Sequence, residues 1–192
     1  RVFPRLREAS HHAAIRFVEP QRGPVDDGTL GERIAQDVLA AAHQEGYRDI
    51  VLVAFGTGAN GVLDALAAGP TDVRGVILID PHFGSAEVMA EVDGAGGVGR
   101  YEYAPDERET GPTAASRRGL GWLGARARSQ RFDPPVMIGM ASESADMATL
   151  GMVSMAMPAA HVHVEDGPPS SAARYAALDA LCLEIFTAPG EN

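Results

Sequence analysis

The sequence lacks most of the features that mark secreted, membrane-bound and lysine-dependent proteins. It has one cysteine, Cys182, so it can form neither an intramolecular disulfide nor a cysteine-rich metal site. All 16 basic residues are arginine, and the absence of lysine excludes Schiff-base chemistry and a P-loop lysine. No apolar run approaches the roughly 18 residues of a membrane span, and the N-terminus lacks the apolar stretch of a signal peptide. We therefore expect a soluble, cytoplasmic protein.

The composition favours one globular domain that binds a small molecule. A chain of 192 residues with 45% hydrophobic residues can form a single domain, over 1–192, with a full core. The formal charge of -10 disfavours nucleic acid as a partner, because the phosphate backbone would be repelled. We expect a small-molecule ligand, no cofactor, no metal, and no nucleic-acid or membrane partner. The oligomeric state stays open, with a homo-oligomer among the options.

Short apolar runs that end at glycine, proline or aspartate predict the strands of a sheet. The clearest runs are 50–55, 76–79 and 136–138, and two weaker ones are 14–18 and 161–164. Because the clear runs lack polar alternation, they suit parallel strands that helices cover on both faces.

Helical patterns alternate with these runs. Thr29 followed by Glu32 predicts a capping box, and Gly46 is placed to end the helix that follows. One face of that helix is apolar, with Leu30, Ile34, Val38 and Ala41. Further helices are predicted over 60–68 and 171–186. The last carries apolar residues at helical spacing, Tyr175, Leu178, Cys182 and Ile185. The alternation predicts an α/β fold with a doubly wound, mostly parallel sheet and right-handed crossovers.

The segment from about 84 to 134 breaks this pattern. Glycine, proline and charged residues dominate it, and seven of the arginines lie between 100 and 131. A compact domain seldom carries so long a loose segment unless it is a lid, which we expect here with one helix over 116–128. Its arginines could then receive a carboxylate or phosphate. The alternative is a solvated surface excursion without a role.

The passage VLVAFGTGANG, at 51–61, has the form of a sharp turn from a strand into a helix. Together with RFVEPQRGP before it, DVRGVILIDP after it, and the later PPVMIGMASES and HVHVEDGPPSS, it resembles the α/β-hydrolase family. The resemblance covers about three quarters of the chain and leaves the expected lid unmatched. It implies a nucleophile elbow, G-x-S-x-G, whose central residue is here Gly56.

The departures from the family pattern concern its catalytic triad. Serine hydrolysis needs an oxygen nucleophile, a histidine and an acid, but Gly56 supplies no oxygen. The segment that implies the histidine, 166–170, has proline instead, and Glu143 stands where the acid is implied. We therefore expect a protein without an ordinary serine triad. It would bind a small, partly apolar molecule and could catalyse a non-hydrolytic step such as cyclisation, elimination or isomerisation.

Two alternatives remain open for the same turn. If the register slips by one, Thr57 becomes the nucleophile of an active esterase or thioesterase, although Asp64 would then face a packed position as an unpaired charge. Residues outside this chain could also complete such an enzyme. In the other alternative, GTGANG is a dinucleotide-binding fingerprint, with Asp80 placed to hold a ribose.

The remaining candidates lie near the expected carboxyl edge of the sheet. His82 follows a central strand at the edge where open α/β sheets bind ligands, and we expect it to act as an acid or base, together with Asp80. The backbone N–H groups of Thr57 and Gly58 form an expected anion-binding nest. We name Thr57, His82 and Glu143 as catalytic candidates. The ligand-binding candidates are Phe55, Gly56, Thr57, Gly58, Asp80 and His82.

Two residue types and the start of the chain give weaker indications. No two of the six histidines have the spacing of a helical metal-binding pair. His161 and His163 are expected to share one face of a strand, but the simpler interpretation is that they are ordinary strand residues and not metal ligands. Six of the seven methionines lie between 137 and 157, as core residues or as the lining of a pocket. The segment 3–9 resembles the family helix that follows an interior strand, so either further strands precede this chain or the sheet is built without that strand.

Overall fold

In the part of the chain that the structure describes, the sheet has four parallel strands, and helices pack on both of its faces. The computed structural model describes residues 14, 16, 18, 22–69, 72–104, 106, 108–158 and 161–187. The strands are β1 (Ile50–Phe55), β2 (Val73–Ile79), β3 (Val136–Ala141) and β4 (Val162–Glu165), in the order β1-β2-β3-β4. Because all neighbours are parallel, their carboxyl ends meet at one edge, where Phe55 pairs with Ile79 and Ala141 with Glu165.

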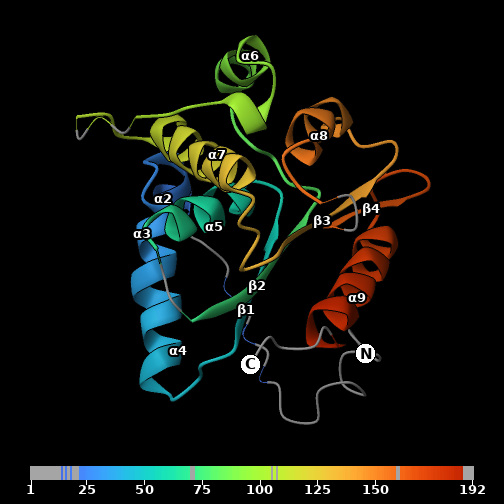
Figure 1. Cartoon of the computed structure of the whole chain (residues 1–192). Coiled ribbons are helices and arrows are strands. Elements are labelled where there is room, and N and C mark those ends of the chain that lie inside the picture. Colours follow the sequence, from blue (N-terminus) through green and yellow to red (C-terminus); the bar gives the residue numbers. More distant parts are fainter. Residues whose placement is uncertain are drawn as a thin grey trace.

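Most helices cover one face of this sheet (Figure 1). They are α2 (Arg22–Asp26), α3 (Leu30–Arg33), the π-helical η1 (Ile34–Leu39), α4 (Ala40–Gln44), α5 (Gly58–Ala67), α6 (Ala86–Gly94), the 3-10 turn η2 (Val98–Arg100), α7 (Pro112–Ser129) and α8 (Met147–Ser154). Leu52, Val76 and Ile138 point from the strands into the main core on this side, where they meet Leu63 of α5 and Leu120 of α7. Burial of these side chains is the main stabilising term.

The helix α9 (Ser171–Thr187) covers the other face of the sheet (Figure 1). Ile77, Ile79 and Met137 alternate with the residues of the first core and pack against Leu178 and Leu181 of α9. The sheet is therefore covered on both sides, and the predicted α/β fold with a parallel sheet is confirmed. In the described ranges, no helix combines the length and the apolarity that a bilayer crossing requires.

The predicted strands agree closely with the observed ones. The prediction for β1 has the observed bounds, those for β2 and β3 are three residues too short, and that for β4 is shifted by one residue. The strand predicted over 14–18 is absent at its described residues, Ala14, Arg16 and Val18. Its other residues, like the helix resembled by 3–9, lie outside the described part of the chain. β1 is an edge strand of the described sheet, with Val53 and Phe55 exposed.

The predicted capping box at Thr29 is wrong. The Thr29 side chain makes no cap hydrogen bond, because its hydroxyl donates to Asp27 Oδ1 at 2.7 Å. Glu32 instead accepts a hydrogen bond from Gln36, one turn further along. The predicted end at Gly46 is confirmed, since Gly46 has a φ of 91° and follows the C-cap residue of α4, Glu45.

The apolar faces of the first and last helices are only partly as predicted. The π-helical register of η1 makes Leu39 the most buried residue of the first helix, while Val38 is half-buried. Leu178, Cys182 and Ile185 of α9 are buried, but Tyr175 is exposed. Burial raises the pKa of the Cys182 thiol to about 12, so this cysteine acts as a small apolar core residue.

The segment expected to be a lid is more structured than its composition suggests. Its predicted helix is the middle of α7, which packs on α5 and belongs to the layer that covers the sheet. Val88 and Val92 of α6 and Val98 of η2 are fully buried in the main core. The interpretation as a solvated excursion is therefore wrong, because these valines need the core for burial. A lid role stays a prediction for α6 and η2, which lie beyond the strand ends in Figure 1.

Candidate functional site

The turn between β1 and α5 is the structural centre of the site. β1 ends at Phe55 and α5 begins at Gly58, so two residues reverse the chain direction. Gly56 has a φ of 54°, in the left-handed region, whereas Thr57 is helical with a φ of -64°. No atom lies within 4 Å of the point where a Cβ of Gly56 would be. The apex of the turn is therefore at Gly56, and there is room for a side chain that glycine does not supply.

The loop after β2 is fastened to this turn. The Gly56 N–H donates to the carbonyl of Ile79 at 3.1 Å, and the Gly56 carbonyl accepts from the His82 N–H at 3.0 Å. These two hydrogen bonds hold the backbone of His82 beside the apex. The sequence candidates Gly56 and His82 are thus direct neighbours in the structure.

Asp80 lies at the start of the loop after β2, and both of its carboxylate oxygens already accept hydrogen bonds. It has a φ of 43° and is 8% exposed. Its Oδ1 accepts from the Ala141 N–H at 3.1 Å, and its Oδ2 accepts from Arg174 Nε at 2.6 Å. Asp80 therefore connects β2 to β3 and α9, and it does not line the cavity described next.

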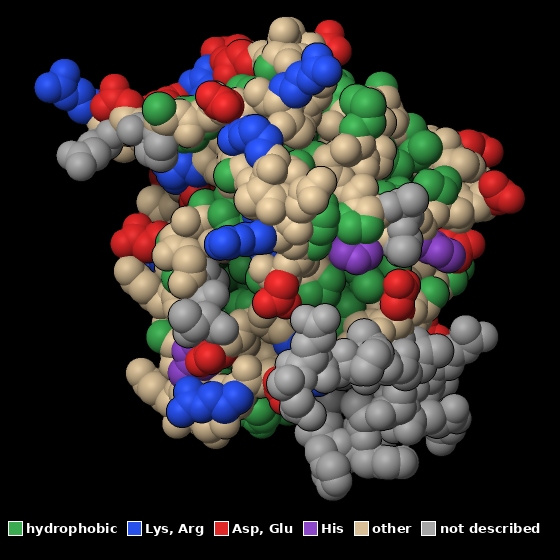
Figure 2. All heavy atoms as spheres, in the orientation of Figure 1, with side chains coloured by type: hydrophobic (Ala, Val, Ile, Leu, Met, Phe, Trp, Pro, Cys, Tyr) green, Lys and Arg blue, Asp and Glu red, His purple; other side chains and the backbone are tan. Residues whose placement is uncertain are grey.

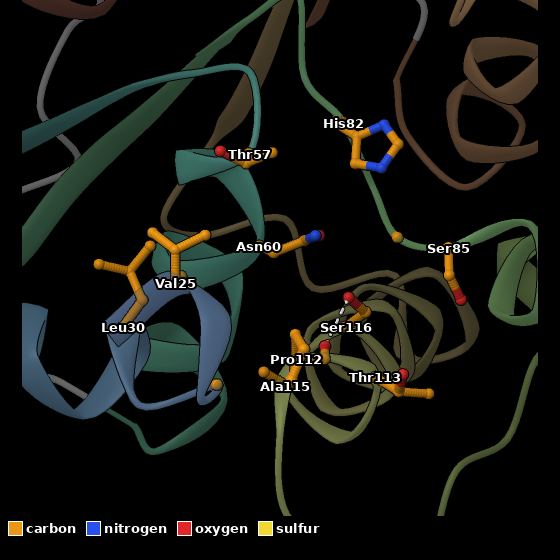
Figure 3. A pocket seen from close by; sticks show the side chains of 13 residues that line it. Val25, Leu30, Thr57, Asn60, His82, Ser85, Pro112, Thr113, Ala115 and Ser116 are labelled. Atoms are coloured by element: carbon orange, nitrogen blue, oxygen red, sulfur yellow. Dashed lines mark hydrogen bonds between the residues drawn. The ribbon is translucent and has the colours of Figure 1, made fainter. Parts of the chain in front are cut away.

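A cavity of about 210 Å³ lies beside the turn, between α5, the start of α7, the loop after β2 and the turn from α2 to α3. Its apolar walls come from Val25, Leu30, Pro112 and Ala115. Its polar groups are Thr57, Asn60, His82, Ser85, Thr113 and Ser116 (Figure 3). No aspartate, glutamate or arginine belongs to this lining, as far as the structure describes the chain.

The polar groups of the cavity differ in how far they are already engaged. Ser116 donates to the Pro112 carbonyl at 2.9 Å, and the Ser85 hydroxyl accepts from the Val88 N–H at the start of α6. Asn60 points into the hollow in Figure 3, and its Oδ1 is buried without a hydrogen-bond partner. A buried amide oxygen without a partner is costly, so Asn60 is a ready binding group for a ligand.

His82 lines the cavity, and its imidazole lies next to the carboxylate of Asp146. Its Nδ1 lies 3.4 Å from Oδ1 of Asp146, the residue that precedes α8. The side chain of His82 is 46% exposed and that of Asp146 is 34% exposed. The distance is long for a hydrogen bond.

Glu143 lies on the neighbouring loop after β3, away from the cavity lining. The Glu143 N–H donates to the Gly167 carbonyl at 3.1 Å, and the Gly167 N–H donates to the Ser142 hydroxyl at 2.9 Å. The loops in which the resemblance implies an acid and a histidine are therefore held side by side. The second loop has glycine and two prolines at 167–169, so it offers no imidazole.

The candidates Phe55 and Gly58 do not line the cavity either. Phe55 is the last residue of β1, and its side chain is 43% exposed. Gly58 is the first residue of α5. A Cβ at this position would lie 3.7 Å from the Cβ of Ala54. Of the sequence candidates, the structure thus brings Thr57 and His82 together around one cavity, with Gly56 beneath His82.

The arginines of the segment 84–134 serve the fold rather than the cavity. Arg117 pairs with Glu87, Glu91 and Glu109, and its hydrogen bonds hold the pKa of the Glu91 carboxyl below its usual value. Arg128 donates to the carbonyl of Tyr101 at 2.8 Å. Basic and acidic side chains lie interspersed over α6 and α7 in Figure 2. Arginines as receivers of an anionic ligand are therefore not supported at this cavity.

Arg118 corrects one premise of the sequence interpretation. Asp64 is buried, which would be costly for an unpaired charge. It is paired, however, because Arg118 donates to both of its carboxylate oxygens, at 2.6 and 3.1 Å. The buried position of Asp64 therefore does not oppose Thr57 as a nucleophile. What does oppose it is the conformation of the turn, which places the left-handed residue at Gly56.

The methionines, His161 and His163 lie outside the cavity lining, and His161 precedes β4, so the predicted shared strand face of the two histidines is wrong. Met137 and Met140 are buried core residues, whereas Met155 is 73% exposed. His163 pairs with Glu165 at 2.7 Å, and burial lowers the pKa of His161. Within the described residues, no group of three or more histidine, cysteine, aspartate or glutamate side chains could hold a metal ion.

The sequence interpretation missed Asn60 and Asp146. The sequence interpretation includes Asn60 only as part of GTGANG, although it lies three residues after Thr57, about one helical turn, and lines the same cavity. Asp146 is three residues after Glu143, in the loop where the resemblance implies an acid. The sequence therefore offers Asp146 as a second carboxylate of that loop, but it gives no sign that this carboxylate faces His82.

Comparison with known proteins gives structural likenesses only. No family model and no curated protein sequence matches the chain. An alpha/beta hydrolase enzyme from the metagenome of lagoon sediments of Mar Chica, Morocco, has 15% identity and a TM-score of 0.48, over 81% of this chain and 69% of that one. A hydrolase from Pseudomonas aeruginosa PA01 has 17% identity and a TM-score of 0.46, over 82% and 72%. An S-formylglutathione hydrolase from Staphylococcus aureus has 13% identity and a TM-score of 0.45, over 83% and 61%.

The chain is thus structurally similar to α/β-hydrolases. At TM-scores below 0.5 and identities of 17% or less, this similarity does not assign an activity. The geometry of the chain itself has to support any functional proposal.

Proposed function

We propose that this chain is an α/β-hydrolase-like protein without an ordinary serine triad, which binds a small, partly apolar molecule beside its degenerate elbow. The observation that carries the proposal is the apex at Gly56, which has a left-handed backbone, open space above it and no side chain. A fold that keeps this turn without its nucleophile has kept the site and not the hydrolytic chemistry. The expected cytoplasmic location and small-molecule partner belong to the same proposal.

The cavity supports a small ligand with one or two polar groups. Its volume of about 210 Å³ is below the roughly 300–1,000 Å³ of pockets for drug-sized ligands. The lining combines apolar side chains with three polar residues, Asn60, Thr57 and His82. These groups could support a non-hydrolytic step, such as a cyclisation, elimination or isomerisation that needs only proton transfer.

An esterase that uses Thr57 is the second candidate, because Thr57 and His82 line the same cavity. A dinucleotide-binding module has less support. Gly61, the last glycine of the fingerprint, is explained by packing, since a Cβ there would lie 2.4 Å from Leu30 Cγ. Asp80, the expected ribose partner, is already bound by Arg174 and the Ala141 N–H.

A ligand screen with a blocked cavity tests the proposal. Thr113 is half-buried in the cavity wall, and Thr113→Trp should fill the cavity. The control is Ala90→Trp, at an exposed residue of α6. We expect neutral compounds from a fragment library to raise the melting temperature of the wild type and of Ala90→Trp but not of Thr113→Trp. Compounds that stabilise all three proteins equally, or none, would contradict the proposal.

A further inference from the structure

We propose that Asp146 positions His82 so that its Nε2 is a proton acceptor inside the cavity, acting on a small neutral carbonyl compound. This deepens the proposed function and rests on it for the identity of the cavity as a ligand site. The juxtaposition comes from two loops at the carboxyl edge of the sheet. His82 follows β2, and Asp146 ends the loop that follows β3.

The backbone of His82 is held in place on both sides of the residue. Its N–H is bonded to the Gly56 carbonyl at 3.0 Å, and the neighbouring Phe83 is 1% exposed in the main core. Asp80, two residues earlier, is fixed by Arg174 and by the Ala141 N–H. The imidazole is therefore presented from a rigid support, as a proton-transfer group requires.

Asp146 determines which ring nitrogen is free. A carboxylate beside Nδ1 favours the tautomer with its proton on Nδ1, because that N–H can then donate to the carboxylate. Nε2 is left without a proton and with a free lone pair. Figure 3 shows one ring nitrogen of His82 directed toward the space bordered by Asn60 and Ser85, and since Asp146 takes Nδ1, we assign this nitrogen as Nε2.

The rest of the lining favours a neutral substrate with a carbonyl oxygen. No charged side chain other than a protonated His82 belongs to the described lining, so a full charge on the ligand would have no counter-ion. Thr57, the N-cap residue of α5, lines the cavity, and so do the first two residues of α7, Pro112 and Thr113. Neither helix has a side-chain cap, so both N-termini can favour negative charge that develops on a carbonyl oxygen.

The step is balanced within one molecule. Nε2 takes a proton from the carbon next to the carbonyl, and the electron pair of that C–H bond forms the double bond of an enolate. The imidazolium, paired with Asp146, then returns the proton to another atom of the same molecule. No oxidant, water or second substrate is consumed, in keeping with an elbow that presents no nucleophile.

Histidine NMR tests the positioning directly. In protein with ¹⁵N-labelled histidine, His82 is assigned by its loss in His82→Gln, and we expect its neutral ring to carry the proton on Nδ1. Asp146→Ala should remove this preference, and Asp146→Leu, which also lacks an acceptor, serves if that variant folds poorly. His163, which pairs with Glu165, provides the control, because Glu165→Gln should change the His163 signals and leave those of His82 unchanged. A wild-type His82 with its proton on Nε2 would overturn the proposal.

Hydrogen exchange of hydroxyacetone in D₂O tests the acceptor role. We expect wild-type protein to speed exchange at the carbons next to the carbonyl by about 100-fold or more over His82→Gln, the lower end of general-base catalysis. Asp146→Ala should lower the rate without abolishing it, while His163→Gln should not change it. Equal rates in the wild type and His82→Gln would overturn the acceptor role. If the tautomer is as expected but no fragment binds in the cavity, the proposed function fails and the positioning of His82 stands.

Discussion

At the scale of single residues, glycines decide whether the cavity can exist. Gly28 has a φ of 76°, and a Cβ there would lie 2.1 Å from the backbone carbon of Gly111. This contact brings the turn between α2 and α3 against the start of α7 and closes one side of the cavity. Gly56 and Gly46 also have positive φ angles, of 54° and 91°, but no atom lies within 4 Å of a Cβ at either position.

These glycines allow strain and steric overlap to be separated. We expect Gly56→Ala and Gly46→Ala to lower the free energy of unfolding by about 1–2 kcal/mol each, the cost of a left-handed conformation. Gly28→Ala should cost clearly more, since its methyl group must also displace the Gly111 backbone. Urea unfolding of the three variants measures the difference. A Gly28→Ala no less stable than Gly56→Ala would mean that the two segments are not in direct contact.

At the scale of elements, one ion pair joins the two helices that bracket the cavity. Asp64 of α5 is 8% exposed in its side chain, and Arg118 of α7 binds it through two nitrogens. A Cβ at Gly119 would lie 2.7 Å from Leu63 Cβ, so the helices touch closely at the same level. The pair therefore lies between packed helices and is partly shielded from solvent.

Removal of one partner should be far more harmful than removal of both. We expect Arg118→Ala to cost about 3 kcal/mol of unfolding free energy, because the buried Asp64 carboxylate loses its only ion-pair partner among the described residues. The double variant Asp64→Leu with Arg118→Leu should cost less than Arg118→Ala alone. Chemical denaturation of the single and double variants gives the coupling energy.

The exposed pair of Arg33 and Asp37 is the matched control. Their side chains are 57% and 60% exposed, so Arg33→Ala should change the unfolding free energy by less than about 1 kcal/mol. A cost for Arg118→Ala as small as that for Arg33→Ala would show that Asp64 is solvated and that α5 and α7 are less closely packed.

At the scale of the whole molecule, the local sequence pattern predicted the sheet and missed the partners made across it. Residues 50–55 form a strand because an unbroken apolar run between turns suits a doubly covered strand. The sequence around Asp64 does not indicate its partner Arg118, which comes 54 residues later. Likewise, the sequence around Asp80 does not indicate Arg174, 94 residues later. The pairing of His82 with Asp146, 64 residues apart, was out of reach for the same reason.

The composition of the segment 84–134 does not reveal how much of it is buried, because composition indicates exposure only on average. Glycines and arginines dominate this segment. Gly119 and Gly124, however, allow α7 to pack closely against its neighbours, and Arg117 and Arg118 form ion pairs with carboxylates. A segment can therefore appear loose in sequence and still form a layer of the fold, when its small residues lie at the helix contacts.

The central claim is that the elbow keeps its shape without a nucleophile, and covalent labelling with a fluorophosphonate probe tests it most directly. Intact-mass measurement of the native protein at neutral pH should show no adduct, because Gly56 presents no oxygen, while a serine esterase in a parallel reaction is labelled completely. An adduct of one probe molecule on Thr57, lost in Thr57→Ala and in His82→Gln, would contradict the claim and identify the chain as a working hydrolase.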